Sequence, residues 1–367
     1  MKSISTERPL SFNRRDFVKA ASAVVVGATT AVGAASPLVA KTPPTIAPKI
    51  PLGFDNFSIR AHQWKADRLI KFAGEQQLDS LLMSDLNVYE NFDAKYLGDL
   101  KLKASDAGVL LHAGTGSICP TAQRFTDKWG TAEELLRLGI RVANSLGSPV
   151  FRCYLGGEKD RHSEGGIQSH IDATVAELKK VRTFAIDSNV KIAVENHAGD
   201  MQAWELVNLI EAAGPEFVGA TIDSGNATWT LEHPTQNLEV LGPYAVSSGI
   251  RDSTVWDYEQ GAMVAWNAVG EGQVDWANYA ERYSQLCPDV PFQLEIISGF
   301  SKSFAHKTQK FWKVYPEAKA SDFSRFLELA RSGKSVANGQ ANDPEFQMNE
   351  LMKSIRYCKS KLGMGRK

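Results

Sequence analysis

Apolar and polar positions along this chain alternate between short apolar runs and longer amphipathic stretches. The short runs are rich in β-branched residues and bounded by Gly, Pro or Asn, which is typical of buried parallel strands. The longer stretches, such as 132–146 and 167–189, repeat apolar residues at spacings of three and four, as outer helices do. The predicted strands cover residues 52–57, 80–84, 108–113, 149–154, 191–195, 218–223, 245–252 and 292–296. Eight strands alternating with helices predict a (β/α)8 TIM barrel.

The chain continues beyond the last predicted strand. Residues 311–316 form an aromatic segment that we expect to cover the barrel, and helical patterns follow at 321–332 and 345–362. The stretch between these two helices, 333–344, has the Gly and Asn content of a linker. We therefore expect one barrel over residues 41–300 and a C-terminal helical extension over 301–367 that packs on it.

Three of the apolar runs end in a carboxylate, at Glu195, Asp223 and Glu295. Because the C-terminal ends of barrel strands meet at one mouth, we expect these side chains to lie close together. Three carboxylates in one place repel one another unless a cation or shared protons relieve the charge. The pattern predicts a divalent metal ion or strongly shifted pKa values. The alternative is three unrelated strand-end caps.

Arg152 lies inside the apolar run of the fourth predicted strand. A guanidinium there is costly unless it points into the mouth and meets an anion or a carbonyl oxygen, or pairs with one of the carboxylates. Both interpretations place Arg152 at the site. Gly156 and Gly157 then allow a sharp turn, and the polar segment 158–166, too polar for the core, is either a mobile lid or an ordinary surface loop.

Histidine and tryptophan residues near the later strand ends are further candidates. His197 and His112 lie near predicted strand ends, where each could supply a nitrogen ligand or a neutral hydrogen bond. Trp256 and Trp266 belong to residues 253–267, a predicted hairpin that extends the mouth. Tryptophan faces pack against sugar rings, although most aromatic residues of a barrel fill the layer between helices and strands.

The N-terminus has the layout of a twin-arginine export signal. Arg14 and Arg15 precede a weakly apolar stretch, 20–39, and cleavage is expected near Ala40. A membrane anchor or an amphipathic helix is the alternative, but the stretch is less hydrophobic than a spanning helix requires. We expect transport by the twin-arginine (Tat) export machinery, a periplasmic or otherwise exported location, and no stable membrane span in the mature form.

Charge and cysteine content exclude several classes of protein. Residues 1–40 hold five of the 41 basic and two of the 42 acidic residues, so the rest carries 36 basic and 40 acidic residues. A net charge of −4 gives no reason to expect a nucleic-acid partner. The four cysteines form no C-x-x-C pair, which argues against a zinc ribbon or a disulfide-rich scaffold. The sequence is compatible with a homo-oligomer but does not predict a particular oligomeric state.

The order of motifs resembles the xylose isomerase-like TIM-barrel superfamily, which contains sugar phosphate isomerases and epimerases, ketose 3-epimerases and endonuclease IV. The resemblance rests on residues 194–197, 222–226, 250–252, 269–276 and 294–295. It implies metal ligands at Glu195, Asp223 and Glu295, with Glu195 and Glu295 also transferring protons. It further suggests substrate contacts from Asn226 and Arg251.

One family position differs in this chain. Where the family has H-x-K-D, this chain has Gly249, Ile250, Arg251 and Asp252, so the histidine ligand is replaced by glycine. A site of three carboxylates favours Mn²⁺ or Mg²⁺ over Zn²⁺, because hard cations prefer oxygen ligands.

The function implied by these features is isomerisation or epimerisation of a small carbohydrate substrate. A divalent ion would stabilise an enediolate, Glu195 and Glu295 would serve as acid and base, and Arg152 would hold the substrate. A 3-keto-glycoside lyase or hydrolase using the same enolate is the first alternative, and a sugar-binding barrel without catalysis is the second. Endonuclease-type DNA cleavage is disfavoured, because it needs more histidine ligands and a basic groove.

Overall fold

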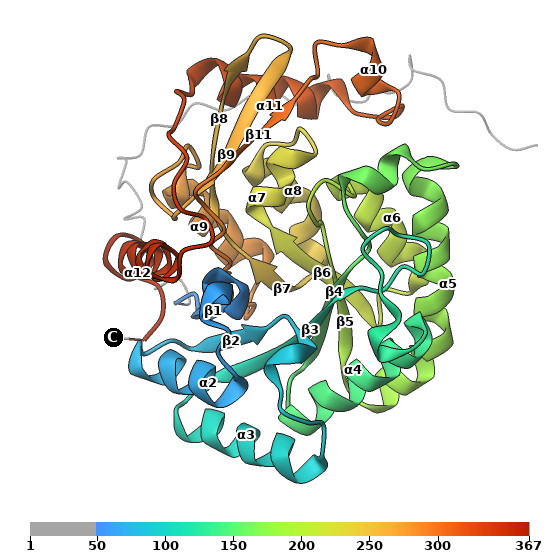
Figure 1. Cartoon of the computed structure of the whole chain (residues 1–367), viewed down its shortest axis with the longest axis vertical. Coiled ribbons are helices and arrows are strands. Elements are labelled where there is room, and N and C mark those ends of the chain that lie inside the picture. The colour runs from blue at the N-terminus through green and yellow to red at the C-terminus, as the bar shows by residue number, and fades with distance from the viewer. Residues whose placement is uncertain (1–48, 367) are drawn as a thin grey trace, which may run out of the picture. The chain divides into compact units, whose positions relative to one another are not determined.

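The computed structural model describes residues 49–366, and within this part of the chain eight parallel strands form a barrel surrounded by helices (Figure 1). In chain order the strands are β1 (Leu52–Asp55), β2 (Ser80–Met83), β3 (Leu110–Ser117), β4 (Val150–Tyr154), β5 (Lys191–Glu195), β6 (Val218–Asp223), β7 (Ala245–Gly249) and β10 (Phe292–Leu294). Each corresponds to one of the eight predicted strands, so the predicted TIM barrel is confirmed.

The barrel closes on both sides of β10. On one side β10 pairs in parallel with β1, and Leu52 lies opposite Phe292. On the other side the contact is made by the residue after β7: the Ile250 N–H donates to the Gln293 carbonyl at 2.7 Å, and the Glu295 N–H donates to the Ile250 carbonyl at 2.9 Å. The backbone of Glu295 is therefore fixed by the closure of the barrel.

The helices around the barrel follow their strands in sequence. They are α2 (Ala66–Glu75), α3 (Ala94–Asp106), α4 (Ala132–Leu146), α5 (Gly166–Asp187), α6 (Ala203–Ala213), α8 (Pro234–Leu241), α9 (Trp276–Leu286) and α12 (Pro344–Lys361). The main apolar core fills the layer between these helices and the strands. α12 lies beside the first turn after β1, so the C-terminal helix completes the ring (Figure 1).

Local sequence explains why these helices begin and end where they do. In α4, Thr131 and Glu134 form a capping box at the N-terminus, and Gly147 ends the helix in the left-handed region with a φ of 72°. One face of α4 is apolar and buried, as the spacing of its residues predicts.

A second, smaller sheet extends the mouth of the barrel. It contains β8 (Asp252–Tyr258), β9 (Gly261–Asn267) and β11 (Ser301–Phe304), which pair antiparallel. The helices α7 (Ser224–Trp229), α10 (Gln309–Trp312) and α11 (Ala320–Ser332) lie near it (Figure 1). Val255, Val264, Trp266, Phe304 and Phe326 belong to its separate apolar cluster. The predicted hairpin over residues 253–267 is confirmed.

The boundaries of the third strand differ from the prediction. β3 begins at Leu110 and continues to Ser117, because its small residues keep pairing with β4 beyond Ala113. Gly114 opposes Arg152, and a Cβ at Gly114 would lie 3.0 Å from the Arg152 carbonyl oxygen. His112 therefore lies within the strand, and the expectation that it lies near the strand end is wrong.

The segment 158–166 contributes buried residues, so the expectation that it is too polar for the core is wrong. Arg161 is buried, and its guanidinium bonds to both oxygens of Glu205 at 2.7 and 2.9 Å. The same guanidinium packs on Tyr315 at 4.0 Å from the ring centroid. This cation is buried because a carboxylate and an aromatic ring both contact it.

Two of the remaining predictions concern membranes and export. Between residues 49 and 366, no helix combines the length and apolar character needed to cross a bilayer. The predicted twin-arginine signal, residues 1–40, lies outside the described residues and stays a prediction.

Candidate active site at the barrel mouth

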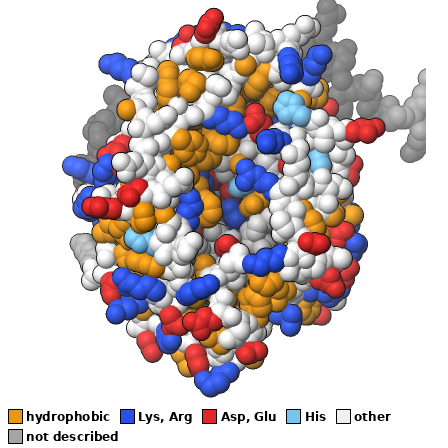
Figure 2. Space-filling model, in the orientation of Figure 1, with side chains coloured by type: hydrophobic (Ala, Val, Ile, Leu, Met, Phe, Trp, Pro, Cys, Tyr) orange, Lys and Arg blue, Asp and Glu red, His pale blue; other side chains and the backbone are white. Residues whose placement is uncertain are grey.

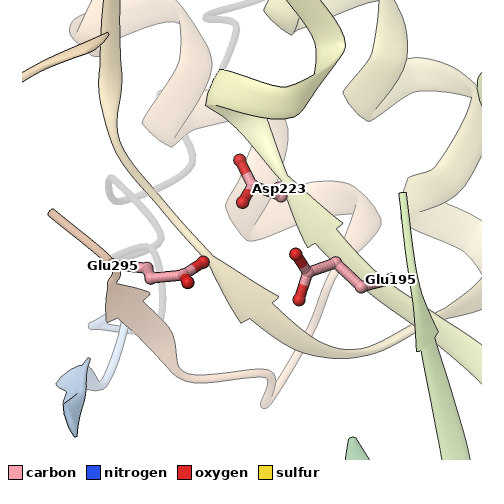
Figure 3. Close-up of side chains that lie close together, drawn as sticks. All are labelled: Glu195, Asp223 and Glu295. Atoms are coloured by element: carbon pink, nitrogen blue, oxygen red, sulfur yellow. The ribbon is translucent and has the colours of Figure 1, made fainter. Parts of the chain in front are cut away.

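Glu195, Asp223 and Glu295 converge at the mouth of the barrel. Glu195 and Asp223 are the last residues of β5 and β6, and Glu295 follows β10 directly. Their side chains point toward one another (Figure 3), and one oxygen of each lies within 4.8 Å of the others. All three are buried, with exposed fractions of 1%, 0% and 4%. The strand-end pattern thus correctly predicts that the three carboxylates meet.

Burial shifts the protonation of this carboxylate cluster, defined as Glu195, Asp223 and Glu295. The pKa of Glu195 is raised to about 7: burial is the main cause, the Arg152 guanidinium opposes the rise, and the nearby Glu295 adds to it. The pKa of Asp223 is also well above its usual range, chiefly because of burial, and Arg251 opposes this shift. Two guanidinium groups therefore decide how much negative charge the cluster holds.

Arg152 is the first of these groups. Its Nε donates to Glu195 Oε2 at 2.6 Å, and its Nη1 donates to the Thr115 carbonyl at 3.0 Å. The guanidinium also lies 5.2 Å from the ring centroid of Tyr154. The predicted position at the mouth is confirmed, and its partner there is Glu195.

Arg251 is the second group, and it reaches the centre of the carboxylate cluster. Its Nη2 bonds to Asp223 Oδ2 and to Glu295 Oε2. The side chain is 1% exposed, and the guanidinium lies 4.4 Å from the centroid of the Trp266 ring. Its Nε and Nη1 have no partner among residues 49–366. Arg251 therefore brings a positive charge to the site, together with two buried nitrogens that lack a protein acceptor in the described part of the chain.

Asn226 connects two of the carboxylates from the first turn of α7. Asp223 caps this helix, since its Oδ1 accepts the N–H groups of Gly225 and Asn226 at 2.8 Å each. The Asn226 Nδ2 then donates to Asp223 Oδ2 at 2.8 Å and to Glu195 Oε1 at 3.1 Å. The cap leaves only Oδ2 of Asp223 directed into the cluster.

His197 lies at the same mouth but contacts no carboxylate of the cluster. Its ring stacks on Tyr154 at 3.6 Å between centroids, and its Nδ1 lies 2.7 Å from the Gly156 carbonyl oxygen. Burial, with a contribution from Arg152, holds the pKa of His197 well below its usual range. The ring is therefore neutral, with Nδ1 as the donor to Gly156 and Nε2 free to accept.

His112 and Trp256, two predicted substrate contacts, do not line the cavity at this mouth. The His112 Nδ1 lies 3.1 Å from Ser247 Oγ and 2.8 Å from Gln293 Nε2, deep inside the barrel. Trp256 lies on β8 opposite Met263, away from the cavity. Trp266, on the neighbouring strand, supplies the indole at the site instead.

A cavity of about 220 Å³ opens above the carboxylate cluster. The hollow in Figure 2 shows positive side chains beside hydrophobic ones in this face of the molecule. The cavity is lined by Phe57, Ser84, Arg124, Arg152, Tyr154, His197, Ala198, Asn226, Trp229, Arg251, Trp266, Glu295 and Ile297. Glu295 reaches the cavity itself, whereas Glu195 lies behind two lining residues, Arg152 and Asn226.

Other residues of this region are not predicted from the sequence as site candidates. Among them, Tyr154 and Arg124 line the cavity, and Asp55 lies beside the cluster at the end of β1. Burial and the charge of Glu295 raise the pKa of Asp55 to about 8. β1 is also an apolar strand whose last residue is a carboxylate, Asp55. The strand-end pattern that predicts Glu195, Asp223 and Glu295 therefore applies to Asp55 as well.

The carboxylate cluster could bind a metal ion, since its oxygens are hard ligands at suitable separation. The guanidinium of Arg251, however, bonds to two of the three oxygens that such an ion needs. An ion and this guanidinium do not fit the cluster together. Binding of Mn²⁺ or Mg²⁺ requires Arg251 to withdraw.

Comparison with known proteins gives the family. The model of the family described as "Xylose isomerase-like TIM barrel" matches residues 82–297. No curated protein matches the chain significantly.

Solved structures share the fold at low identity. An L-ribulose 3-epimerase is 16% identical, with a TM-score of 0.53 over 86% of this chain and 99% of its own. D-psicose 3-epimerase with D-tagatose, from Clostridium cellulolyticum H10, is 14% identical, with a TM-score of 0.51 over 76% and 96%. A Bacillus anthracis protein titled "probable 3-DHS dehydratase AsbF" is 12% identical, with a TM-score of 0.53 over 74% and 100%. Since the family model covers more than half of the sequence, this chain belongs to the xylose isomerase-like TIM barrel family.

Proposed function

We propose that this protein is a sugar isomerase or epimerase, which moves a proton on a carbon next to a carbonyl group. The observation that carries the proposal is the pair of buried carboxyls, Glu195 and Glu295, beneath a cavity that also presents guanidinium donors. An acid and a base close together beside a group that stabilises an oxyanion are the requirements for enediolate chemistry.

The proton transfer is divided between the two glutamates. Glu295 lines the cavity and removes the proton next to the substrate carbonyl. Glu195 has a pKa of about 7, so near neutral pH it is present in both protonation states and can return a proton. Because Glu195 lies behind Arg152 and Asn226, substrate must move one of these side chains to reach it.

The developing enediolate oxygen is stabilised by guanidinium groups. Arg251 lines the cavity, and its Nε and Nη1 are buried without a protein acceptor within residues 49–366, so a substrate oxygen must enter beside them to accept these N–H groups. These N–H groups are fixed before the reaction by the bonds of Nη2 to Asp223 and Glu295. Fixed donors of this kind stabilise a transition-state charge without reorganisation.

The cavity suits a single sugar ring. Its volume of about 220 Å³ lies below the roughly 300–1,000 Å³ of pockets for drug-sized ligands. Tyr154, Trp229 and Trp266 line the cavity as apolar contacts for a sugar, although one face of Tyr154 is covered by His197 and Trp229 and Trp266 stack on each other. His197 Nε2 and Asn226 offer polar contacts for hydroxyl groups.

A metal-dependent version of this reaction would use Glu195, Asp223 and Glu295 as ligands of Mn²⁺ or Mg²⁺, with Zn²⁺ less favoured. The bound ion would polarise the substrate carbonyl. Since Arg251 occupies two of these carboxylates, no step of the proposed reaction depends on an ion.

Elimination is the second candidate reaction. The same enolate can expel a β substituent, as a 3-keto-glycoside lyase requires, and the similarity of fold to the protein titled a dehydratase favours keeping this alternative. The small cavity favours a monosaccharide over a glycoside. Location also bears on substrate choice: an exported protein, as residues 1–40 predict, would meet few phosphorylated sugars.

Product analysis in D₂O tests the proposal. Ketoses, aldoses and a 3-keto disaccharide are incubated with the parent protein, with Glu295→Gln, and with the exposed control Glu281→Gln. We expect a new sugar isomer with deuterium next to the carbonyl, and at least a 100-fold slower reaction in Glu295→Gln only. Release of a leaving group would instead establish the lyase. Sugar binding without exchange would establish the non-catalytic barrel.

A further inference from the structure

We infer that the Arg251 guanidinium permanently takes the place of a divalent cation, so the carboxylate cluster works without metal. This inference deepens the proposed function, because it identifies the cation of the same site. It is tested by metal binding, which can be measured whether or not the protein turns over a sugar.

The contacts of the cluster give the first argument. Each carboxylate already has a guanidinium partner: Arg251 bonds to Asp223 and Glu295, and Arg152 bonds to Glu195. Asn226 adds a neutral bridge between Glu195 and Asp223. These bonds relieve the mutual repulsion of the three carboxylates, which is the role that the strand-end pattern assigns to a metal ion.

Two glycines leave space for the guanidinium. A Cβ on Gly225 would lie 2.5 Å from Arg251 Cδ, so a side chain there would displace the stem of the arginine. A Cβ on Gly249 would lie 2.9 Å from Glu295 Oε2 and 3.6 Å from Asp223 Oδ2, at the two oxygens that Arg251 bonds.

The surroundings of Arg251 hold it in this position. Ser224 Oγ accepts from the Arg251 N–H at 3.0 Å and donates to the Arg251 carbonyl at 2.7 Å. The Trp266 Nε1 donates to the Gly225 carbonyl at 2.9 Å, which keeps the indole face against the guanidinium. Backbone, stem and charged group are each fixed by a separate contact.

A divalent ion would have to break this arrangement. It would need oxygens of Asp223 and Glu295, and it would leave the Arg251 charge buried beside a second positive charge. Removing the partners of a buried ion is strongly unfavourable.

Titration with Mn²⁺, followed by electron paramagnetic resonance, tests the inference. The proteins are the parent, Arg251→Met, the double variant Arg251→Met with Asp223→Asn, and the surface control Arg282→Met, whose side chain pairs with Glu239. We expect no stoichiometric site in the parent or in the control. Arg251→Met should gain one site, at least 100-fold tighter than any parent binding, and the double variant should lose it.

A second measurement on the parent alone covers the case in which Arg251→Met fails to fold. The melting temperature of the parent should not change when EDTA, Mn²⁺ or Mg²⁺ is added. One tightly bound ion in the parent, or a lower melting temperature in EDTA, would overturn the inference. Absence of sugar turnover with these metal results would contradict the proposed function and leave the inference standing. Turnover that requires Mn²⁺ would overturn the inference and the metal-free course of the reaction, while the assignment as a sugar isomerase or epimerase would stand.

Discussion

The Arg251 side chain passes over Gly225 in a space that the side chain of any residue larger than glycine would fill. The stem of Arg251 passes the Gly225 Cα so closely that a Cβ would lie 2.5 Å from Cδ. This close approach lets the guanidinium reach Asp223 and Glu295. The position of the Arg251 guanidinium in the carboxylate cluster therefore depends on Gly225, which has no side chain to contact either carboxylate.

The first prediction concerns Gly225→Ala. The added methyl group should push Arg251 out of the cluster, lower the free energy of unfolding by about 1–3 kcal/mol and reduce turnover at least tenfold. Urea unfolding and steady-state kinetics measure the two effects. Gly98→Ala is the matched control, because a Cβ there meets nothing within 4 Å in α3; it should stabilise by about 0.4–1 kcal/mol. Equal behaviour of the two variants would refute the close approach.

The second prediction concerns the pH dependence of stability through Asp55. Burial raises the pKa of Asp55 to about 8, above its unfolded value of 3.8, and its Oδ2 lacks a partner within residues 49–366. The folded state therefore binds the proton more tightly, and this stabilisation is complete at low pH and lost as pH rises from about 4 to 8. In Asp55→Asn the free energy of unfolding should fall less steeply with rising pH, by up to about 1.4 kcal/mol per pH unit. Urea unfolding at several pH values measures this dependence. The exposed control Asp106→Asn should show the same change of unfolding free energy with pH as the parent.

The third prediction concerns Arg152 and the pH profile of the reaction. The Arg152 charge lowers the pKa of Glu195, so Arg152→Met should raise that pKa by about one unit. If Glu195 acts as the acid, activity falls as Glu195 loses its proton, and the alkaline limb should move to higher pH in the variant. The pH dependence of kcat/KM measures this shift. An unchanged alkaline limb would show that Glu195 is not the acid.

The fourth prediction concerns His197. His197→Phe keeps an aromatic ring against Tyr154 but removes the bond to Gly156 and the free Nε2. We expect KM to rise about fivefold with kcat changed little, because one neutral hydrogen bond to substrate contributes on the order of 1 kcal/mol. A fall in kcat at constant KM would instead assign His197 to the chemical step.

The fifth prediction concerns the buried pair Arg161 and Glu205. Arg161→Met leaves the Glu205 carboxylate without its guanidinium and should cost about 3–5 kcal/mol of unfolding free energy. Adding Glu205→Leu to that variant should restore most of the loss, since an apolar pair can replace a buried ion pair. Chemical denaturation of the two variants measures the loss and the recovery of unfolding free energy. No recovery would mean that stability depends mainly on the other bonds of the pair, which are those of Arg161 to the Asp200 and Val314 carbonyls and that of Glu205 to the Gln202 N–H.

Much of the fold could be predicted because strand ends carry a local signal. Apolar runs of about five residues located all eight barrel strands, and their last residues identified Glu195 and Asp223 directly. The pattern does not mark Asp55, because the predicted strand continues to Phe57 and hides the carboxylate at the end of β1. It places His112 near a strand end because the apolar run stops at Ala113, before the small residues that continue β3 to Ser117.

The contact between Arg251 and the carboxylates could not be predicted from the sequence. The direction of its side chain depends on Gly225, on the indole of Trp266 and on the closure of the barrel at Ile250. These residues are brought together only by the tertiary structure. The same reason explains why Trp266 lines the cavity and Trp256, on the paired strand, does not.

The most direct test of the account is deuterium exchange into a ketohexose by metal-free protein. The protein is treated with EDTA, dialysed into D₂O, and followed by proton NMR with and without added Mn²⁺. We predict exchange next to the carbonyl at the same rate in both samples, because Arg251 supplies the positive charge. Exchange that appears only after Mn²⁺ is added would contradict the account.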